Sequence, residues 1–383
     1  EYFPGRQENG PKNNMTLPAQ PDIFNIIASF ESLCAAYRRA RLGKQGKPKI
    51  CEFDFYLEAE LNKLEHQLKT NQYQPSSYTH FKVREPKLRQ VSAPAFRDRV
   101  VHHSLVAEIE PLFDKQFIYD SYACRKNKGT HLGAKRVKKF LMAARTKYGK
   151  DQPIYALQAD IKQFFQSIDW NILLQLINKT ITCPQTYDLI EKIITSYKPY
   201  KSATPQPAQL NLFNQSHHHL VTGTRVGLPI GNLTSQLFAN VYLNQLDHFI
   251  KDRLREKYYA RYMDDFLIIH PDKEHLLNLQ DKIKKFLQKK LKLKLHPKKI
   301  TIKHAKNGIP FVGYRIFYDH VLIRGNTLRR MQKNYRNKVR AYHDGKITLE
   351  KLRETESALY GHFNHADTYG LEQKMFKHNQ NLK

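Results

Sequence analysis

Two adjacent aspartates interrupt an otherwise apolar segment in the second half of the chain. The segment ARYMDDFLIIH covers residues 260–270, and Asp264 and Asp265 stand between its two apolar halves. Asp is a poor strand residue, and neighbouring carboxylates repel each other. Two explanations are open from the residues alone. Either the pair lies in a surface turn, which tolerates Asp, or it is buried and holds a cation or shares a proton.

A third carboxylate ends another predicted strand. The segment PIYALQADI, residues 153–161, is strand-like and carries Asp160 near its end. Two strands that each end in Asp would, if set side by side, form an oxygen-lined site for Mg²⁺. Two such ions, roughly 3.5–4 Å apart, can activate an attacking hydroxyl and stabilise a leaving oxygen. The spacing leaves this metal site and the surface turn both open.

The net charge restricts the partners that the chain can bind. Lys and Arg total 64 against 35 Asp and Glu, so the 383 residues carry a net charge of +29 spread over their whole length. Such an excess favours a positively charged channel for nucleic acid. A membrane surface is the alternative, but no long helix with one basic and one apolar face is evident, and no apolar run reaches about 18 residues. The four scattered cysteines form no CxxC pair and indicate reduced thiols in a cytoplasmic protein.

Apolar periodicity predicts an order of helices and strands. Residues 1–20 are expected to form a mobile tail, and the loop-rich stretch from Lys198 to Val221 contains three consecutive histidines that fit a solvated loop better than a metal site. A basic hairpin is expected over 78–94 and a short strand pair over 299–318. Helices are expected over 24–41, 53–68, 97–113, 131–148, 171–181, 232–254, 274–290 and from 327 onward.

Three segments resemble motifs A, B and C of reverse transcriptases and occur in the family's order. They are ADIKQFFQSID (159–169), GLPIGNLTSQLFANVYLNQLD (227–247) and RYMDDFLIIH (261–270). KLRQVSAPAFRDRVV and SYACRKNKGTHLGAKR resemble its finger motifs, LKLKLHPKKITI resembles motif D, and IPFVGYRIF resembles the primer-grip turn. The resemblance covers about residues 80–320.

The resemblance implies an α+β right-hand polymerase fold. In that fold, residues 21–150 would form N-terminal helices and fingers, and residues 151–320 a palm made of an antiparallel sheet plus helices. Residues 321–383 would form a helical thumb. No RNase H or endonuclease segment is evident.

The resemblance also assigns the catalytic roles. Asp160, Asp264 and Asp265 correspond to the ligands of two catalytic Mg²⁺ ions, which Mn²⁺ can replace. Lys299 corresponds to the lysine that protonates the departing pyrophosphate. Asp169 also lies in motif A, but its spacing favours a cap on the helix that begins near Trp170.

The substrate contacts follow in the same way. For the incoming deoxynucleotide the resemblance implies triphosphate contacts by Lys82 and Arg89, and an aromatic ring, Phe165, under the sugar where a 2′-hydroxyl would clash. Its motif B contacts are Ile230, Gly231 and Gln236. Arg99 and Arg125 are expected to make template or structural contacts, and Gly313 and Tyr314 to form the primer grip.

Motif B also suggests the type of reverse transcriptase. The pattern IGxxxSQ, from Ile230 to Gln236, resembles the enzymes of diversity-generating retroelements, as does GHFNHADTY at 361–369. Such an enzyme, encoded by bacteria or phages, copies a template RNA with errors opposite adenine and works with a small basic accessory variability protein. The alternative is an antiphage defence enzyme that acts with a structured noncoding RNA. Group II intron maturases, an inactive RNA-binding scaffold and an RNA-templated RNA polymerase are less favoured.

Overall fold

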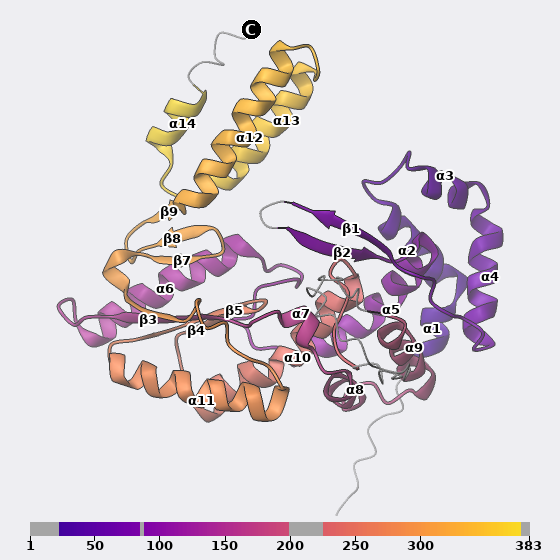
Figure 1. The fold of residues 1–383 in the computed structure, drawn as a ribbon, viewed down its shortest axis with the longest axis horizontal. Helices are drawn as coiled ribbons and strands as arrows, with labels where there is room; N and C mark the ends of the chain where they lie inside the picture. The colour runs from indigo at the N-terminus through magenta and orange to yellow at the C-terminus, as the bar shows by residue number, and fades with distance from the viewer. Residues whose placement is uncertain (1–22, 85–87, 199–224, 377–383) are drawn as a thin grey trace, which may run out of the picture.

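The structure is a computed structural model that describes residues 23–84, 88–198 and 225–376. The tail expected over residues 1–20, the tip of the basic hairpin at Glu85–Pro86 and the three histidines 217–219 lie outside the described residues. Helices and antiparallel sheets are both present, in the order shown in Figure 1.

The N-terminal region is a helical layer, drawn in indigo and violet in Figure 1. Two segments that the periodicity predicts as single helices are each divided in two. The first divides at Ser29, whose hydroxyl accepts a hydrogen bond from the Ser32 amide and so caps the second helix. The helices are α1 (Ile23–Ala28), α2 (Phe30–Arg41), α3 (Pro48–Phe55) and α4 (Leu57–Lys69), packed around α5 (Phe96–Asp114).

The basic hairpin is present as predicted. Its strands are β1 (Thr79–Val83) and β2 (Arg89–Ala93), paired antiparallel with Lys82 opposite Gln90. All five residues of β1 are exposed, so the hairpin is a projecting element rather than part of the core. The amide of Ser92 donates to the carbonyl of Ile230 at 3.1 Å, which joins the hairpin to the motif B loop.

A four-stranded antiparallel sheet forms the predicted palm, in the order β4-β5-β3-β6. Alternate residues of β3 face opposite sides: Leu157 and Ala159 join one core and Ala156 the other. The helices α11 (Lys273–Leu291) and α6 (Thr130–Tyr148) cover the two faces. The strands are β3 (Tyr155–Asp160), β4 (Tyr259–Tyr262), β5 (Asp265–His270) and β6 (Thr301–His304).

Four further helical elements extend the side of the palm that lies beneath the fingers. The helix at 184–195 was not predicted, although its buried residues Leu189, Ile190, Ile193 and Ile194 follow the helical period. The elements are α7 (Phe164–Ser167), α8 (Trp170–Asn178), α9 (Pro184–Thr195) and α10 (Leu233–His248), and α10 continues into a π-helical turn, Phe249–Arg253.

The strand pair expected over 299–318 is replaced by two separate structures. β6 pairs with β3 and so completes the palm sheet, whereas β7 (Ile309–Phe311) and β8 (Tyr314–Ile316) form a hairpin that β9 (Val321–Ile323) extends. The expected palm–thumb boundary at 320/321 falls between β8 and β9. A 3₁₀ turn, η2 (Ala305–Asn307), links β6 to β7.

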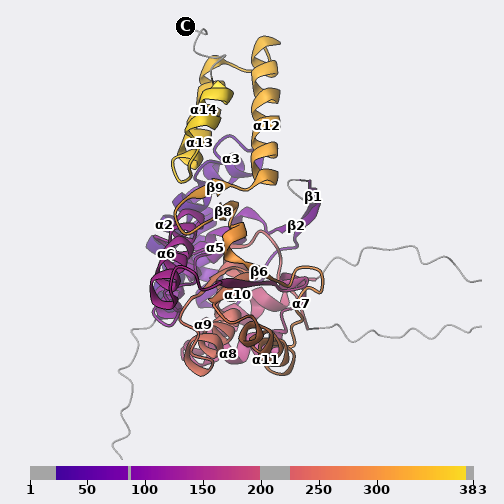
Figure 2. The same ribbon diagram turned by 90° about the vertical axis from the view of Figure 1, so that its left-hand side faces the viewer.

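Three helices follow this small sheet and stand above it. Figures 1 and 2 both place them on the side of the palm opposite α11. They are α12 (Gly325–His343), α13 (Leu349–Phe363) and α14 (Tyr369–Phe376). Within the described ranges, none of the helices is both long enough and apolar enough to cross a lipid bilayer.

Candidate active site

The palm sheet brings two of the three predicted catalytic carboxylates directly opposite each other. In the antiparallel pairing of β3 with β5, Asp160 faces Asp265 across the ladder. Opposed residues of an antiparallel pair project to the same face, with Cβ atoms roughly 4.5–5.5 Å apart. Both lie on the α6 side of the sheet, because Ala156 of β3 and Leu267 of β5 share their parity and belong to the core that contains α6.

The third carboxylate belongs to the turn between β4 and β5. Met263 has φ +54°, in the left-handed region, and this turn places Asp264 immediately before β5. The amide of Ile161 donates to the carbonyl of Asp264 at 3.2 Å, so the turn is tied to the end of β3. The pair therefore combines features of both alternatives from the sequence: it lies at a turn, and it is partly buried.

The carboxylates are an electrostatically unfavourable group. Burial raises the pKa of Asp264, with the charge of Asp160 adding to the effect and the positive charges of Lys299 and Arg89 opposing it. Burial also raises the pKa of Asp265 to about 7, and both other aspartates contribute to that shift. Such a site gains stability from an added cation.

Lys299 is the cation nearest to this group. Its Nζ lies 2.6 Å from Oδ2 of Asp160, although the two residues are far apart in the sequence. The motif D segment reaches the site because His296 donates its amide to the carbonyl of Asp160 at 2.8 Å and Lys299 donates its amide to His296. Among the described residues, neither Asp264 nor Asp265 has an ion-pair partner within 4 Å.

The donor set of this site suits a hard divalent cation. Three carboxylates supply oxygen ligands, and the raised pKa values of two of them indicate negative charge in excess of what the surrounding protein compensates. In the described ranges, however, no three His, Cys, Asp or Glu side chains are already gathered closely enough to form a metal cluster. The ammonium group of Lys299 forms an ion pair with the carboxylate of Asp160, which is one of the three expected metal ligands.

A second buried charge lies in the same hairpin and is fully compensated. Arg261 of β4 and Asp247 of α10 are both completely buried, and their side chains join through bonds of 2.7 and 2.6 Å. The guanidinium also donates to Oδ1 of Asn240 and to the carbonyl of Met263, both at 3.1 Å. This network fixes the backbone of the turn that carries Asp264.

Asp169 acts as the predicted helix cap. Its Oδ1 accepts from the Ile172 amide at 3.1 Å at the start of α8, and its Oδ2 accepts from Lys292 at 2.7 Å. The structural role predicted from its spacing is confirmed, and Asp169 takes no part in the carboxylate group.

The projecting hairpin carries the two predicted triphosphate contacts. Lys82 and Arg89 are exposed on β1 and β2, and the positive charge of Arg89 lowers the pKa of Asp264. Lys82 lies on the strand that pairs with that of Arg89.

Phe165 and the neighbouring Phe164 differ in burial. Phe164 is 2% exposed and belongs to the core, whereas Phe165 packs only partly against it. The carbonyl of Phe165 accepts from the Leu228 amide at 2.7 Å, which places Phe165 beside the motif B loop. Its ring is therefore held at the junction of motifs A and B.

The motif B residues form the loop and first turn that lead into α10. Gly231 has φ +119°, and a Cβ at this position would lie 3.0 Å from the side chain of Val91, so both the backbone and the space favour glycine. Ile230 is half-buried and bonds β2 through its carbonyl, and Gln236 is half-buried on α10. The neighbouring Asn232 donates to the hydroxyl of Tyr78 at 2.9 Å.

Arg125 and Arg99 make internal contacts. Arg125 donates to Asp114 at 2.6 Å and to the carbonyls of Ile118 and Ser121, and its side chain is 7% exposed. Arg99 is half-buried and donates to the carbonyl of Pro94 at 3.1 Å. Of their two expected roles, template or structural contact, the geometry gives Arg125 a structural one.

Gly313 and Tyr314 lie in the turn between β7 and β8. Val312 and Gly313 both have positive φ, as a tight hairpin turn requires. Tyr314 is fully buried, and its hydroxyl lies 2.8 Å from Nδ1 of His131 and 3.2 Å from Nδ1 of His362. Tyr314 therefore supports the turn from behind, where α6 meets α13.

Two contributors to the site were missed from the sequence. The first is the Arg261–Asp247 network, and the second is Arg324, whose charge lowers the pKa of Asp265. The strictly apolar neighbours of Arg261 in KYYARYM were a usable signal, because a lone charge in a buried strand demands a partner. Nothing local distinguishes Arg324 from the many other basic residues.

Comparison with known proteins identifies a family whose match includes the three aspartates. The family described as "Reverse transcriptase (RNA-dependent DNA polymerase)" matches residues 81–316. Protein YkfC of Escherichia coli K12 is 24% identical over 294 residues, which cover 68% of this chain and 72% of YkfC. The group II intron-encoded protein LtrA of Lactococcus lactis is 24% identical over 345 residues, covering 73% of this chain. The chain spans about half of LtrA, 53% of its length.

Solved structures give the same fold. A telomerase from Candida tropicalis, solved with a fragment of telomeric RNA, superimposes with a TM-score of 0.50 at 14% identity. The match covers 84% of this chain and 58% of the telomerase chain. At this identity the similarity concerns the fold alone, and it confirms the predicted α+β polymerase architecture.

Proposed function

The chain belongs to the reverse transcriptase (RNA-dependent DNA polymerase) family, and we propose that it copies a template RNA into DNA at the site formed by Asp160, Asp264 and Asp265. The family match covers more than half of the chain, and the enzyme class predicted from the motifs is that of the family. The observation that carries the proposal is the pairing of Asp160 with Asp265 across β3 and β5, with Asp264 in the adjoining turn.

In this proposal the three aspartates hold Mg²⁺, with Mn²⁺ as a substitute. When bound, the metal supplies activation of the primer 3′-hydroxyl and stabilisation of the charge on the leaving pyrophosphate. Lys299, now on Asp160, holds a proton beside the site and is the candidate acid for the pyrophosphate. Lys82 and Arg89 bind the triphosphate from the hairpin, and the ring of Phe165 excludes a 2′-hydroxyl.

Primer extension by the purified chain tests the polymerase function. The assay uses an RNA template annealed to a DNA primer, the four deoxynucleotides and Mg²⁺. We expect extension that requires the divalent ion and falls at least tenfold when ribonucleotides replace deoxynucleotides. Absence of incorporation with Mg²⁺ and with Mn²⁺ would overturn the proposal. Equal use of ribonucleotides would indicate an RNA polymerase instead.

We further propose that the enzyme belongs to a diversity-generating retroelement. Motif B supports this, because the side chain of Ile230 cannot hydrogen-bond near the nascent base pair, which weakens geometric checking. Its substrates would be a template RNA, the RNA/cDNA duplex and deoxynucleotides, with a small basic accessory variability protein as partner. The chain's excess of basic residues suits these nucleic acids.

Sequencing of the cDNA tests this finer proposal. We expect misincorporation concentrated opposite template adenines, and fewer such errors with Ile230→Asn, while Leu233→Asn, a polar substitution one turn away, serves as a control. Errors without adenine bias would favour the antiphage defence alternative, in which a structured noncoding RNA is the template.

A further inference from the structure

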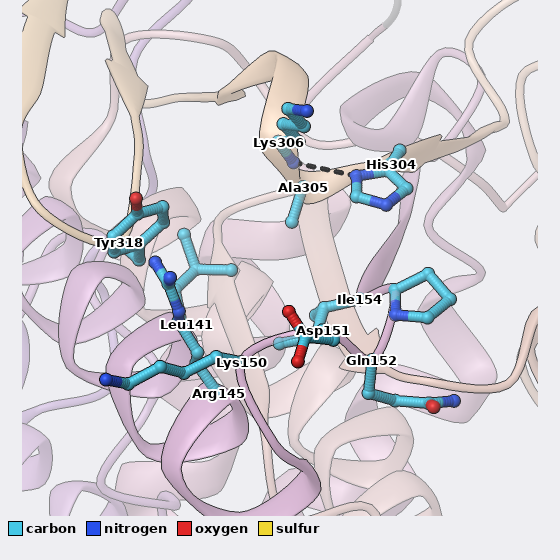
Figure 3. Close-up of a pocket in the computed structure, with 11 residues that line it drawn as sticks. Leu141, Arg145, Lys150, Asp151, Gln152, Ile154, His304, Ala305, Lys306 and Tyr318 are labelled. Atoms are coloured by element: carbon cyan, nitrogen blue, oxygen red, sulfur yellow. Dashed lines mark hydrogen bonds between the residues drawn. The ribbon is translucent and has the colours of Figure 1, made fainter.

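A hollow opens at the end of the palm sheet that lies away from the catalytic aspartates. Its volume is about 400 Å³, and a second hollow of about 590 Å³ adjoins it and shares Arg145, Lys150 and Tyr318. We call the first hollow the far pocket. Its walls come from the C-terminal part of α6, the segment that leads into β3, the 3₁₀ turn η2, and the loop after β8 (Figure 3).

The far pocket is separate from the catalytic site. Ile154 lines the pocket, and Asp160 lies six residues further along an extended strand. At about 3.3 Å per residue, this is a distance of roughly 20 Å. A nucleotide held at the aspartates cannot also fill the far pocket, so a ligand there would be a different part of the bound nucleic acid or a different molecule.

One wall of the far pocket is a planar stack. The guanidinium of Arg145 lies 3.8 Å from the centre of the Tyr318 ring, and Figure 3 shows the two side chains next to each other at one edge of the pocket. Tyr318 is 41% exposed, although it is a large aromatic residue. Unpaired bases of RNA stack on such aromatic rings and guanidinium planes.

The remaining lining combines apolar side chains with one carboxylate, Asp151, and with the polar side chains of Gln152 and His304. Leu141 and Ile154 are buried, and Ala305 lies opposite them across the pocket. Figure 3 places the carboxylate of Asp151 in the middle of the lining residues. Within the described residues Asp151 has no hydrogen bond or ion pair, and a carboxylate can only accept hydrogen bonds. The pocket thus offers an exposed acceptor, Asp151, beside the apolar surface of Leu141, Ile154 and Ala305.

The rim of the far pocket is basic. Lys150 and Lys306 are exposed, and neither they nor Arg145 pairs with a carboxylate elsewhere in the described ranges. Three cations therefore surround one anion, so a ligand that carries negative charge at its edges is favoured. In a nucleotide, the phosphates can contact the basic rim while the base donates hydrogen bonds to Asp151.

We propose that the far pocket binds one unpaired guanine nucleotide of a single-stranded RNA. Guanine presents two adjacent donors, N1–H and the N2 amino group, which match the two oxygens of Asp151. Its ring stacks beside Arg145 and Tyr318, and its flanking phosphates lie on Lys150 and Lys306. Adenine and cytosine offer Asp151 one amino group and uracil one ring N–H, so guanine is preferred. The inference rests on the proposed function only in taking RNA as the partner.

Binding of two short RNAs to the full chain tests this inference. The probes are fluorescein-labelled UUGUU and UUUUU, measured by anisotropy at 0.2 M salt, where non-specific contacts to a basic protein are weak. We expect tighter binding of UUGUU by about tenfold, since a good bidentate contact to a base discriminates at about this level. Asp151→Asn should abolish the difference, and Arg145→Gln combined with Tyr318→Ala should weaken UUGUU binding about fivefold.

Controls separate this inference from the proposed function. Lys284→Gln removes an exposed lysine of α11 and should leave the guanine preference unchanged, whereas Lys150→Gln should weaken both RNAs. Primer extension on a preformed template–primer should be the same in Asp151→Asn as in the unmodified chain. Equal binding of the two RNAs by the unmodified chain would overturn the far-pocket inference even if it polymerises. A guanine preference without polymerase activity would instead remove the proposed function and keep the pocket.

Discussion

One β-hairpin of this protein carries a fully buried charge, Arg261, and two partly buried ones, Asp264 and Asp265, and the protein compensates them to different extents. In β4, Arg261 is matched by Asp247 with short bonds, and its remaining N–H groups reach Asn240 and a backbone carbonyl. Three and four residues further along, Asp264 lies in the turn and Asp265 faces Asp160, and neither has an ion-pair partner among the described residues. The protein itself supplies the counter-charge of Arg261, but it supplies none for Asp264 and Asp265 among the described residues.

The difference separates structural charge from functional charge. A buried ion pair that satisfies all its hydrogen bonds adds little net stability, but it fixes the backbone, here the turn at Met263. Buried carboxylates without partners cost stability, and a fold retains them where a ligand supplies the missing charge. The network around Arg261 therefore supports a turn whose own charges are left uncompensated.

The largest expected effect is on catalysis at the uncompensated group. Asp264→Asn or Asp265→Asn should lower primer extension at least about 10³-fold, because each removes a metal ligand that provides several kcal/mol of transition-state stabilisation. RNA binding should remain, and the melting temperature should stay the same or rise. Asp281→Asn, an exposed change on α11, is the matched control. Undiminished synthesis by either variant would contradict the assignment.

Breaking the compensated group should affect folding instead. Asp247→Asn leaves Arg261 buried without its counter-charge and should lower the free energy of unfolding by about 3–5 kcal/mol in urea titration. The double variant Arg261→Met, Asp247→Leu should recover much of this loss, since both charges are removed together. If Asp247→Asn lowers the free energy of unfolding by less than about 1 kcal/mol, Asp247 is not the required counter-charge of Arg261.

Magnesium should stabilise the folded protein by binding at Asp264 and Asp265, and not at the Arg261–Asp247 pair. At a concentration of about 100 times its dissociation constant, Mg²⁺ should raise the free energy of unfolding by about 2.7 kcal/mol, and the double variant Asp264→Asn, Asp265→Asn should lose this gain. Thermal melts with Mg²⁺ and after EDTA provide the measurement. Equal stabilisation of both proteins would place the ion elsewhere.

The buried imidazole of His102 remains neutral and so avoids the desolvation penalty of a buried charge. His102 of α5 is 2% exposed, and burial lowers its pKa to about 3. Because the unfolded chain titrates near 6.5, the unfolded state gains a proton first, and stability falls as the pH drops below 6.5. Between pH 6.5 and pH 5 the loss is about 2 kcal/mol.

The variant His102→Leu isolates this contribution from those of other histidines. Its free energy of unfolding should fall less than that of the unmodified chain between pH 7 and pH 5, by about the same 2 kcal/mol. Parallel pH dependence of the two proteins would show that His102 is not held neutral.

The positions of the aspartates relative to their strands and helices could be predicted because those signals are local. Asp160 ends one strand of clear apolar pattern and Asp265 begins another, and the spacing of Asp169 from Trp170 is that of a helix cap. The pairing of these strands is long-range, so the residues alone left it open, and the contact of Lys299 with Asp160 was not predicted. The break at Ser29 and the partner of β6 were missed, since periodicity gives neither the cap geometry nor the strand order.

The hydroxyl of Tyr314 joins the C-terminal helices to the rest of the molecule. One phenolic O–H has a single proton, yet it lies within hydrogen-bond distance of His131 on α6 and of both Nδ1 and the carbonyl of His362 on α13. Helices α6 and α13 thus share one hydrogen-bonding group beneath the turn between β7 and β8. Any movement that separates α13 from α6 therefore breaks this shared contact and frees the Tyr314 hydroxyl beneath the turn.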